Sequence, residues 1–251
     1  MIKAFFRYGT FLVGVYLCVL IYSLPASFVY KNFITLPHGI TAQGVSGSIW
    51  SGRLNTLHVD GYDIENLHWS IVLSDLLRGD IAIDWSIDNQ SGKLSGRAQF
   101  DEDAIHLSGI KGRLDMASLS QQFSRQDFFA SGILILDIEE YSFTADKLKR
   151  ARGTVAWQQA NLLAPVTIDL GGITTTLHEN EGALLVRFVD TGYAVDLSGE
   201  VQLSKWQQYT YQLRFGVRDT TATGVVDVFN LMGLPDDDGY VSLEGEGRIQ
   251  M

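Results

Sequence analysis

Histidine side chains are the first candidates for chemistry in this sequence, because imidazole binds metal ions and titrates near neutral pH. The chain contains five of them: His38, His58, His68, His106 and His178. Metal sites usually show close pairs such as His-x-x-x-His, and no two of these residues stand that close in the sequence. We therefore predict no metal site and expect His58, His68 and His106 to lie on the solvated face of strands.

Carboxylates are the second candidates, and the densest group is Asp236-Asp237-Asp238-Gly239. This run resembles the start of a calcium loop, which has glycine at its sixth position and acidic residues at its first and twelfth. Counting from Gly239 puts Leu234 and Gly245 at those two acidic positions. The run therefore predicts a solvated turn.

Two further patterns fall short of a catalytic site. Glu139-Glu140 and Asp101-Glu102-Asp103 stand where turns or strand ends are expected, and we interpret them as solvated charge. Gly44-Val45-Ser46-Gly47-Ser48 is close to the Gly-x-Ser-x-Gly nucleophile elbow, but its fifth residue is Ser and no strand-to-helix pattern follows. The sequence predicts no catalytic residues, no cofactor and no enzymatic activity.

The composition indicates a folded, acidic protein. Of 251 residues, 46% are hydrophobic and 19% are charged, which is enough apolar material to bury a core and excludes intrinsic disorder. The net charge of −10 argues against nucleic acid as a partner, since phosphate binding needs a basic surface. The single cysteine, Cys18, excludes a disulfide framework and a cysteine-based metal site.

The N-terminal segment predicts a membrane anchor. Residues 8–30 contain no charged side chain, and about 20 apolar residues of helix are needed to cross a bilayer. Lys3 and Arg7 precede the segment, so the positive-inside rule places the N-terminus in the cytoplasm. A cleaved signal peptide is the alternative, but Pro25-Ala26-Ser27 gives no Ala-x-Ala cleavage pattern. We predict an uncleaved transmembrane signal-anchor.

This topology divides the chain into a cytoplasmic N-terminus at residues 1–7, a transmembrane helix at 8–30 and a periplasmic domain at 31–251. An acidic domain without cysteine suits a bacterial periplasm, so we expect a single-pass protein of the inner membrane. A weak similarity between Gly47-Ser48-Ile49-Trp50 and Gly153-Thr154-Val155-Ala156-Trp157 suggests a duplication, with halves at about 44–115 and 150–250.

After this segment the dominant hydrophobic period is two, the period of a strand with one dry and one wet face. The clearest examples are residues 79–88, 93–100, 209–218 and 241–250. Their apolar positions include Ile81, Ile83, Trp85, Tyr211, Leu213 and Phe215. Such alternation is typical of antiparallel sheets with one solvated side.

Glycines recur inside the strands in triplets such as Leu94-Ser95-Gly96 and Leu197-Ser198-Gly199, and glycine within a strand marks a bend, a bulge or a close approach. Helical patterns are scarce: short helices at 115–123 and 223–232, and a single turn at 74–78. The sequence predicts an all-β fold, a long curved antiparallel sheet with few short helices, preceded by one N-terminal transmembrane helix. The sheet is either open as a half-pipe or groove, or closed into a sandwich.

One segment is distinctive enough to suggest a family. Residues 36–54, LPHGITAQGVSGSIWSGRL, follow shortly after the N-terminal segment. This arrangement resembles the type II secretion system protein N family. Similar features elsewhere are Leu24-Pro25-Ala26, Leu76-Leu77-Arg78-Gly79, Gly153-Thr154-Val155-Ala156-Trp157 and Gly233-Leu234-Pro235-Asp236-Asp237-Asp238-Gly239. The resemblance covers essentially the whole chain.

The resemblance implies a non-enzymatic accessory or scaffold protein of the inner membrane, which contacts other type II secretion components and supports export of folded proteins from the periplasm. The family is also distantly similar to the AsmA-like group, whose curved sheets form grooves for lipid. That similarity supplies the alternative function, lipid binding or lipid transfer in the envelope. It implies no catalytic residue.

Two sets of residues are predicted as candidate sites. The distinctive segment predicts partner contacts at Val45, Ser46, Gly47, Ile49, Trp50, Ser51, Gly52 and Arg53. The alternating strands predict an apolar groove lined by Ile81, Ile83, Trp85, Tyr211, Leu213 and Phe215. The expected partners are other secretion proteins, the membrane through the N-terminal helix and, for the alternative function, lipid.

Overall fold

A computed structural model of the protein describes residues 12, 15–16, 19–34, 39–59, 62–123, 129–144, 147–164, 167–191, 195–204, 208–218 and 235–248. The helices are α2 (Ala26–Phe33), α3 (Leu73–Leu76) and α4 (Met116–Phe123). The strands are β1 (Ile40–Gln43), β2 (Ser46–Gly47), β3 (Ser51–Val59), β4 (Tyr62–Ile71), β5 (Ile81–Asn89), β6 (Gly92–Phe100), β7 (Ala104–Asp115), β8 (Phe129–Thr144), β9 (Leu148–Ala164), β10 (Ile168–Asn180), β11 (Ala183–Asp190), β12 (Val195–Ser204), β13 (Gln208–Val217) and β14 (Tyr240–Arg248).

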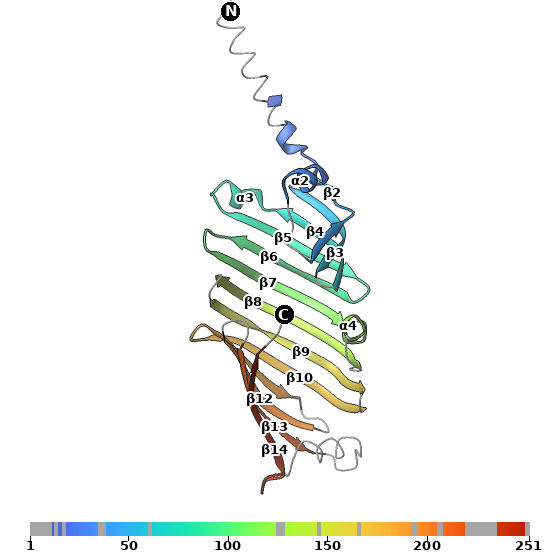
Figure 1. The fold of residues 1–251 in the computed structure, drawn as a ribbon, viewed down its shortest axis with the longest axis vertical. Coiled ribbons are helices and arrows are strands. Elements are labelled where there is room, and N and C mark those ends of the chain that lie inside the picture. Colours follow the sequence, from blue (N-terminus) through green and yellow to red (C-terminus); the bar gives the residue numbers. More distant parts are fainter. Residues whose placement is uncertain are drawn as a thin grey trace, which may run out of the picture.

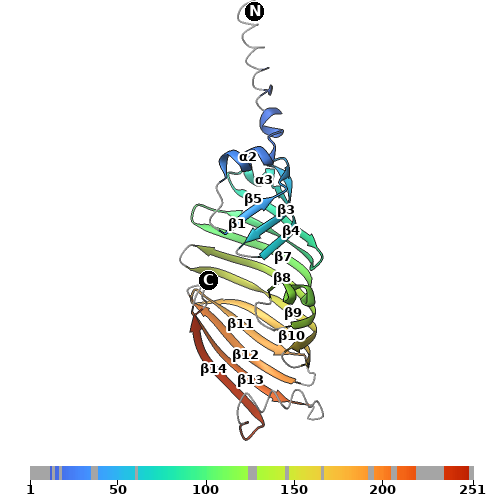
Figure 2. The same ribbon diagram turned by 45° about the vertical axis from the view of Figure 1, so that its right-hand side comes forward.

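All these strands belong to one antiparallel sheet, in which the strand order follows the chain. From β3 to β14 each strand pairs with the next, while β1 and β2 both pair with β3. Figures 1 and 2 show the strands stacked into a long, curved sheet, with α2 at one end and β14 toward the other. Of the two predicted forms, the open curved sheet is confirmed and the closed sandwich is wrong.

The register places apolar residues opposite apolar residues. Trp69 lies opposite Trp85 between β4 and β5, and Leu213 lies opposite Leu243 between β13 and β14. Directly opposed residues on neighbouring antiparallel strands share a face, so one side of the sheet collects the apolar side chains. A shift by one residue would turn them all to the other side. The alternation in the sequence therefore sets the register.

Glycines on this side make room for large side chains of the neighbouring strand. A Cβ atom at Gly245 would lie 2.7 Å from the Tyr211 hydroxyl, and one at Gly96 would lie 3.0 Å from the Trp85 ring. The rings occupy the space above the glycines, and glycines placed in this way allow a sheet to curve. The sequence predicts that glycines inside strands let the sheet curve, and the packing of large rings over these glycines agrees with that prediction.

The short helix α4 begins where the sequence predicts. The Asp115 carboxylate accepts hydrogen bonds from the hydroxyl and the backbone N–H of Ser118, at 2.7 and 2.9 Å. These bonds cap the helix N-terminus, and they lower the pKa of Asp115. The predicted turn at 74–78 overlaps α3, and the predicted helix at 223–232 lies outside the described residues.

Few large side chains are fully buried in the described part of the chain. Many of the buried apolar residues are alanines, and one cluster of larger ones joins Ile168, Val195 and Leu197, with Phe215 packed against it. Most other large apolar side chains of the sheet are half-buried. A second layer of secondary structure would bury these side chains. Within the described residues the apolar side of the sheet is only partly covered, and it is accessible over much of its length.

The predicted anchor at 8–30 is only partly within the described residues. Its last part is α2, and residues 23–25 before it are not helical. Within the described part of the chain, no helix is both long and apolar enough to cross a bilayer. The transmembrane helix stays a prediction.

Replacing Gly52 by alanine is expected to destabilise the sheet near its first hairpin. The added methyl group would overlap the Trp69 ring and lie 2.7 Å from the Ser46 carbonyl oxygen, and overpacking of this kind costs about 1–3 kcal/mol. Thermal unfolding followed by circular dichroism should give a lower midpoint for Gly52→Ala than for the natural chain. Ser51→Ala changes the adjacent exposed side chain and should leave the midpoint unchanged. Equal midpoints for the two variants would contradict this packing.

Candidate functional site

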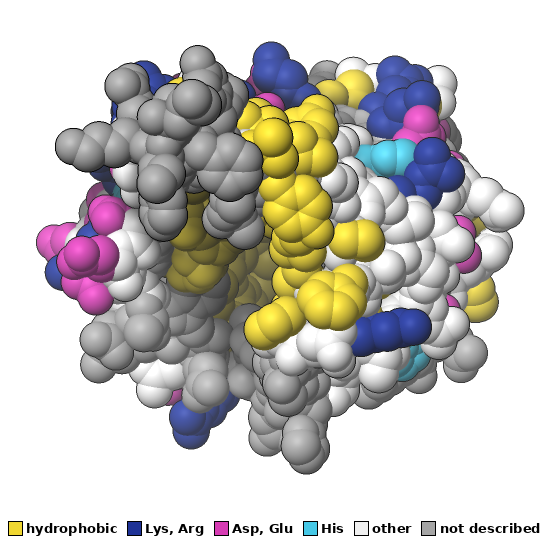
Figure 3. Space-filling model, turned by 90° about the horizontal axis from the view of Figure 1, so that it is seen from above, with side chains coloured by type: hydrophobic (Ala, Val, Ile, Leu, Met, Phe, Trp, Pro, Cys, Tyr) yellow, Lys and Arg dark blue, Asp and Glu magenta, His cyan; other side chains and the backbone are white. Residues whose placement is uncertain are grey.

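The most extensive candidate surface is the side of the sheet that carries the alternating hydrophobic residues, which we call the apolar face. Its residues include Trp69, Ile83, Trp85, Leu107, Leu136, Val155, Leu177, Val186, Val201, Leu213 and Leu243. Seen along the molecule from its N-terminal end, hydrophobic side chains line a hollow in the middle (Figure 3). The apolar face is therefore the inner surface of a groove.

The residues predicted to line a groove lie on this face, in two groups. Ile83 on β5 lies opposite Ala98, and Leu213 on β13 lies opposite Leu243. Strands β6 to β12 stand between the groups, so the two groups line distant parts of one surface and do not form one pocket. The groups are Ile81, Ile83 and Trp85 on β5, and Tyr211, Leu213 and Phe215 on β13.

The distinctive segment around Trp50 forms a connection that we call the joint, between Ile21, Leu24 and Pro25 on one side and Ser48, Ile49 and Trp50 on the other. The Trp50 indole N–H donates a hydrogen bond to the Ile21 carbonyl oxygen at 3.1 Å. The Ile49 backbone N–H donates to the Leu24 carbonyl oxygen at 3.1 Å, and Pro25 forms an isolated β-bridge with Ser48. The joint holds the N-terminal segment against the first strands of the sheet.

The local sequence explains how the joint forms. The Ser48 N–H donates to the Ser51 carbonyl oxygen at 2.9 Å, and the Ser51 N–H donates to the Ser48 hydroxyl at 3.2 Å. Gly47 has a φ of +87°, a left-handed conformation that glycine adopts without strain. This closed turn between β2 and β3 carries Ile49 and Trp50 at its tip.

The eight residues predicted as partner contacts all lie in or beside the joint. Ile49 and Trp50 bind the N-terminal segment of the same chain. The others are Val45, Ser46, Gly47, Ser51, Gly52 and Arg53, on or next to β2 and the start of β3. Their contact with another protein stays a prediction.

The opposite side of the sheet, the polar face, carries charged residues in cross-strand pairs. Arg97 bonds to Asp84 with 2.7 Å between Nε and Oδ1, which raises the pKa of Arg97. Similar pairs are Lys93–Asp88, Lys111–Asp137, Arg150–Glu140, Arg152–Glu139 and Arg187–Glu200. Exposed pairs contribute only about 0–1 kcal/mol each, so their arrangement indicates a face adapted to water.

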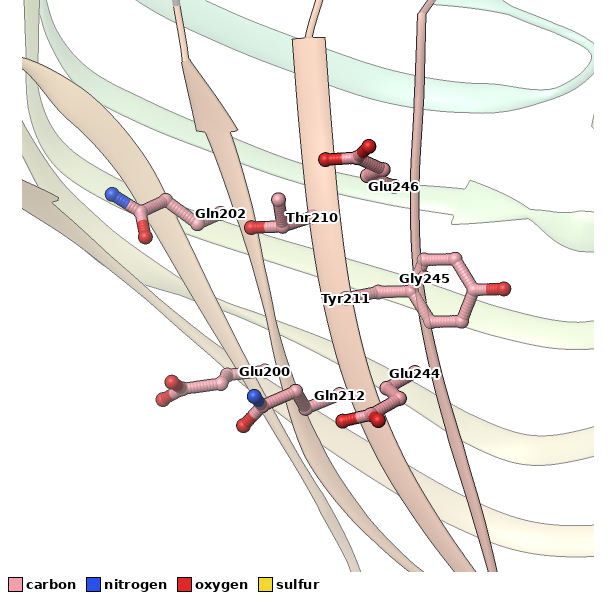
Figure 4. Close-up of a pocket in the computed structure, with 8 residues that line it drawn as sticks. All are labelled: Glu200, Gln202, Thr210, Tyr211, Gln212, Glu244, Gly245 and Glu246. Carbon is pink, nitrogen blue, oxygen red and sulfur yellow. The ribbon is translucent and has the colours of Figure 1, made fainter.

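Near β14 the polar face has a shallow hollow rich in carboxylates (Figure 4). Its side chains come from Glu200, Gln202, Thr210, Gln212, Glu244 and Glu246. In the same view Tyr211 points away from Thr210 and Gln212 of its own strand, as strand alternation requires. The hollow therefore belongs to the polar face and not to the groove.

The residues considered for chemistry are mostly engaged in local bonds. His58 pairs with Asp63 across the β3–β4 hairpin, with 2.6 Å between Nδ1 and Oδ1, and His38 lies outside the described residues. Glu139 and Glu140 lie inside β8 beside a bulge, so the expectation of a turn or strand end there is wrong. Among the described residues, no group of three or more His, Cys, Asp or Glu side chains is placed to hold a metal ion.

The acidic run before β14 forms the predicted turn. The Asp236 carboxylate accepts hydrogen bonds from the N–H groups of Tyr240 and Asp238, at 2.8 and 3.0 Å, and the bond from Tyr240 is the main reason that the pKa of Asp236 is lowered. Arg214 stacks 4.0 Å from the centre of the Tyr240 ring and pairs with Asp236 and Asp238. The turn is thus fastened to β13.

The sequence interpretation missed an exposed apolar group in and after α3. Leu73, Leu76 and Leu77 are 48%, 39% and 90% exposed. Leu76 and Leu77 in the predicted turn at 74–78, with Leu73 just before it, were the available indication, but the sequence alone does not show which of them the neighbouring strands cover.

Comparison with known proteins identifies relatives over almost the whole chain. The family described as "Type II secretion system (T2SS), protein N" matches residues 38–244. The chain is 22% identical to the type II secretion system protein N of Vibrio cholerae serotype O1 over 250 residues, covering 96% of this chain and 98% of that protein. It is 24% identical to the protein of the same description from Aeromonas hydrophila, at 95% and 96% coverage, and 26% identical to that from Pectobacterium carotovorum, at 92% and 94%. No solved structure gives a significant match.

Replacing Trp50 by phenylalanine is expected to loosen the joint without unfolding the sheet. Phenylalanine keeps a ring but lacks the N–H that bonds to Ile21, and a bond of this kind contributes about 0.5–1.5 kcal/mol. Amide hydrogen exchange, measured by mass spectrometry, should become faster in residues 19–25 and 48–51. The matched control is Trp157→Phe, which removes an equivalent indole bond to the Ser131 carbonyl oxygen on β8 and should leave exchange at the joint unchanged. Identical exchange rates at the joint in both variants would show that the Trp50–Ile21 hydrogen bond does not stabilise the joint.

Proposed function

Because the chain belongs to the type II secretion system protein N family, we propose that it is an accessory component of the type II secretion apparatus. It supports the export of folded proteins from the periplasm through contacts with other secretion components and has no catalytic activity of its own. The observation that carries this proposal is the family match over residues 38–244, which spans the sheet from β1 into β14.

We further propose that the protein is anchored in the bacterial inner membrane by one pass, with its N-terminus in the cytoplasm and the sheet in the periplasm. The uncharged residues 8–30, preceded by Lys3 and Arg7, support this orientation. The joint supports it mechanically, because it fastens the end of that segment directly to the sheet. A scaffold without catalysis is also consistent with the polar face, where many acidic groups are paired with cations.

Deleting the gene is expected to reduce the extracellular amount of enzymes that the type II apparatus exports and to leave them in the periplasm. The measurement is the activity of one such enzyme in medium, periplasm and cytoplasm. A plasmid copy of the natural chain should restore secretion. Unchanged secretion in the deletion strain would contradict the proposed role.

A second candidate function is lipid binding or transfer along the apolar face. It is favoured by one observation: this face is continuous from strand to strand, and many of its large side chains are half-buried. Burying one methylene group contributes about 0.8 kcal/mol, so an acyl chain lying in the groove would be held by apolar contact alone. The hollow in Figure 3 gives such a chain a place to lie.

Leu213→Glu is expected to reduce the amount of lipid that copurifies with the protein, because a carboxylate on the apolar face disfavours hydrocarbon beside it. Lipid per protein is measured by extraction and mass spectrometry. Gln212→Glu adds the same charge on the adjacent position of the polar face and should leave bound lipid unchanged. Circular dichroism checks that both variants fold. Equal lipid content in the natural chain and both variants would rule out the groove as the binding surface.

A further inference from the structure

The end of the molecule at which α2 and α3 lie (Figure 1) exposes large apolar side chains from these two elements. We call this group the apolar tip; it consists of Phe28, Phe33 and Ile34 in or after α2, and Leu73, Leu76 and Leu77 in or after α3. Figures 1 and 2 place α2 and α3 at this same end, and hydrophobic side chains gather on it when it is viewed from above (Figure 3). Single exposed apolar residues are ordinary, but a group of this size marks an interaction surface.

In and after α3 an acidic side chain is buried and leucine side chains are exposed, which is the reverse of the usual arrangement. Asp75 is only 5% exposed, and its carboxylate pairs with Arg78 and lies 3.9 Å from the Arg97 guanidinium of β6. The Asp75 carbonyl oxygen also accepts the Asp80 N–H at 3.0 Å. The polar residue thus fastens the turn to the sheet while Leu77 is exposed. Leaving a leucine in water forgoes about 1.5–3 kcal/mol of burial, so this arrangement indicates apolar surroundings at the tip.

The joint brings the N-terminal segment to the same place. Ile21 and Leu24 are bonded to Trp50 and Ile49, and α2 starts directly after Pro25. The apolar residues that precede the joint, Val19 and Leu20, are exposed like those of the tip. A bilayer around this segment would therefore reach the tip as well.

The charges beside the tip fit lipid headgroups. Lys31 lies in the last turn of α2. The Arg78 side chain, directly after Leu77, pairs with Asp75 through one guanidinium nitrogen and is still 69% exposed. Basic side chains next to leucine and phenylalanine are the usual composition of segments that lie in a membrane interface, because the cations face anionic headgroups.

We propose that the apolar tip is a second membrane contact, in which Leu73, Leu76 and Leu77 enter the interface of the bilayer that holds the N-terminal segment. This inference rests on the proposed anchoring and adds a consequence to it. One helix alone lets a domain tilt and rotate, whereas two contacts at one end hold the sheet in a fixed orientation. The groove then extends away from the membrane surface along the length of the molecule.

The test uses the full chain with Cys18→Ser and Leu77→Cys, labelled with a nitroxide and reconstituted into vesicles of phosphatidylethanolamine and phosphatidylglycerol. Electron paramagnetic resonance compares the accessibility of the label to oxygen, which concentrates in lipid, and to a nickel chelate, which stays in water. The ratio of oxygen to nickel accessibility should be higher at position 77 than at Val189→Cys. Val189 is 58% exposed and lies on β11, well away from α3 in the strand order.

The possible results separate the tip from the anchor. A water-like ratio at position 77, equal to that at 189, in protein that resists extraction by alkaline carbonate would overturn the tip contact and leave the anchor standing. Low accessibility of position 77 to both reagents would mean that protein covers the tip, which also overturns the lipid contact. Release of the protein by carbonate would overturn the anchoring and, with it, the tip contact that depends on it.

Discussion

In the described part of the chain, a single sheet must stabilise its own apolar face with no second layer over most of its length. Burial of apolar surface is the main favourable term in folding. A single layer can bury only part of the apolar surface of each strand. The chain meets this constraint by curvature, since rings such as those of Trp85 and Tyr211 lie over Gly96 and Gly245 of neighbouring strands. What remains accessible is a continuous groove, which is the most extensive candidate surface of the protein.

The polar face, the apolar face and the joint each have a different kind of interaction. The polar face carries cross-strand pairs such as Arg97–Asp84 and the carboxylates of the hollow near β14, so it is adapted to water. The apolar face is the surface that we propose for lipid. The joint at Trp50 fixes which end of the groove lies next to the N-terminal segment. The turn at residues 48–51, which lies in the distinctive part of the sequence, therefore determines how the groove is placed relative to the N-terminal segment.

The sequence predicted the parts that depend on local alternation, and missed those that depend on contacts between distant residues. The period of two in β5 and β13 was enough to place Ile83 and Leu213 on a common face, because each strand has only two faces. The bulge beside Glu139 in β8 changes the alternation without any local marker. The roles of Trp50 and Asp75 were also missed, because one donates to a backbone carbonyl near the N-terminus and the other is buried beside an arginine from β6. Such contacts exist only after the sheet has formed.

The reactivity of a cysteine on the apolar face of the folded protein measures directly whether the groove is open. In a Cys18→Ser background, Leu213→Cys and Gln212→Cys sit on adjacent positions that face opposite sides of β13. An open groove predicts that maleimide labels both at rates of the same order, since no second layer of described residues covers either side of β13. Labelling of position 212 alone, with position 213 reacting only after the protein unfolds, would show that the apolar face is covered and that the sheet does not form an open groove.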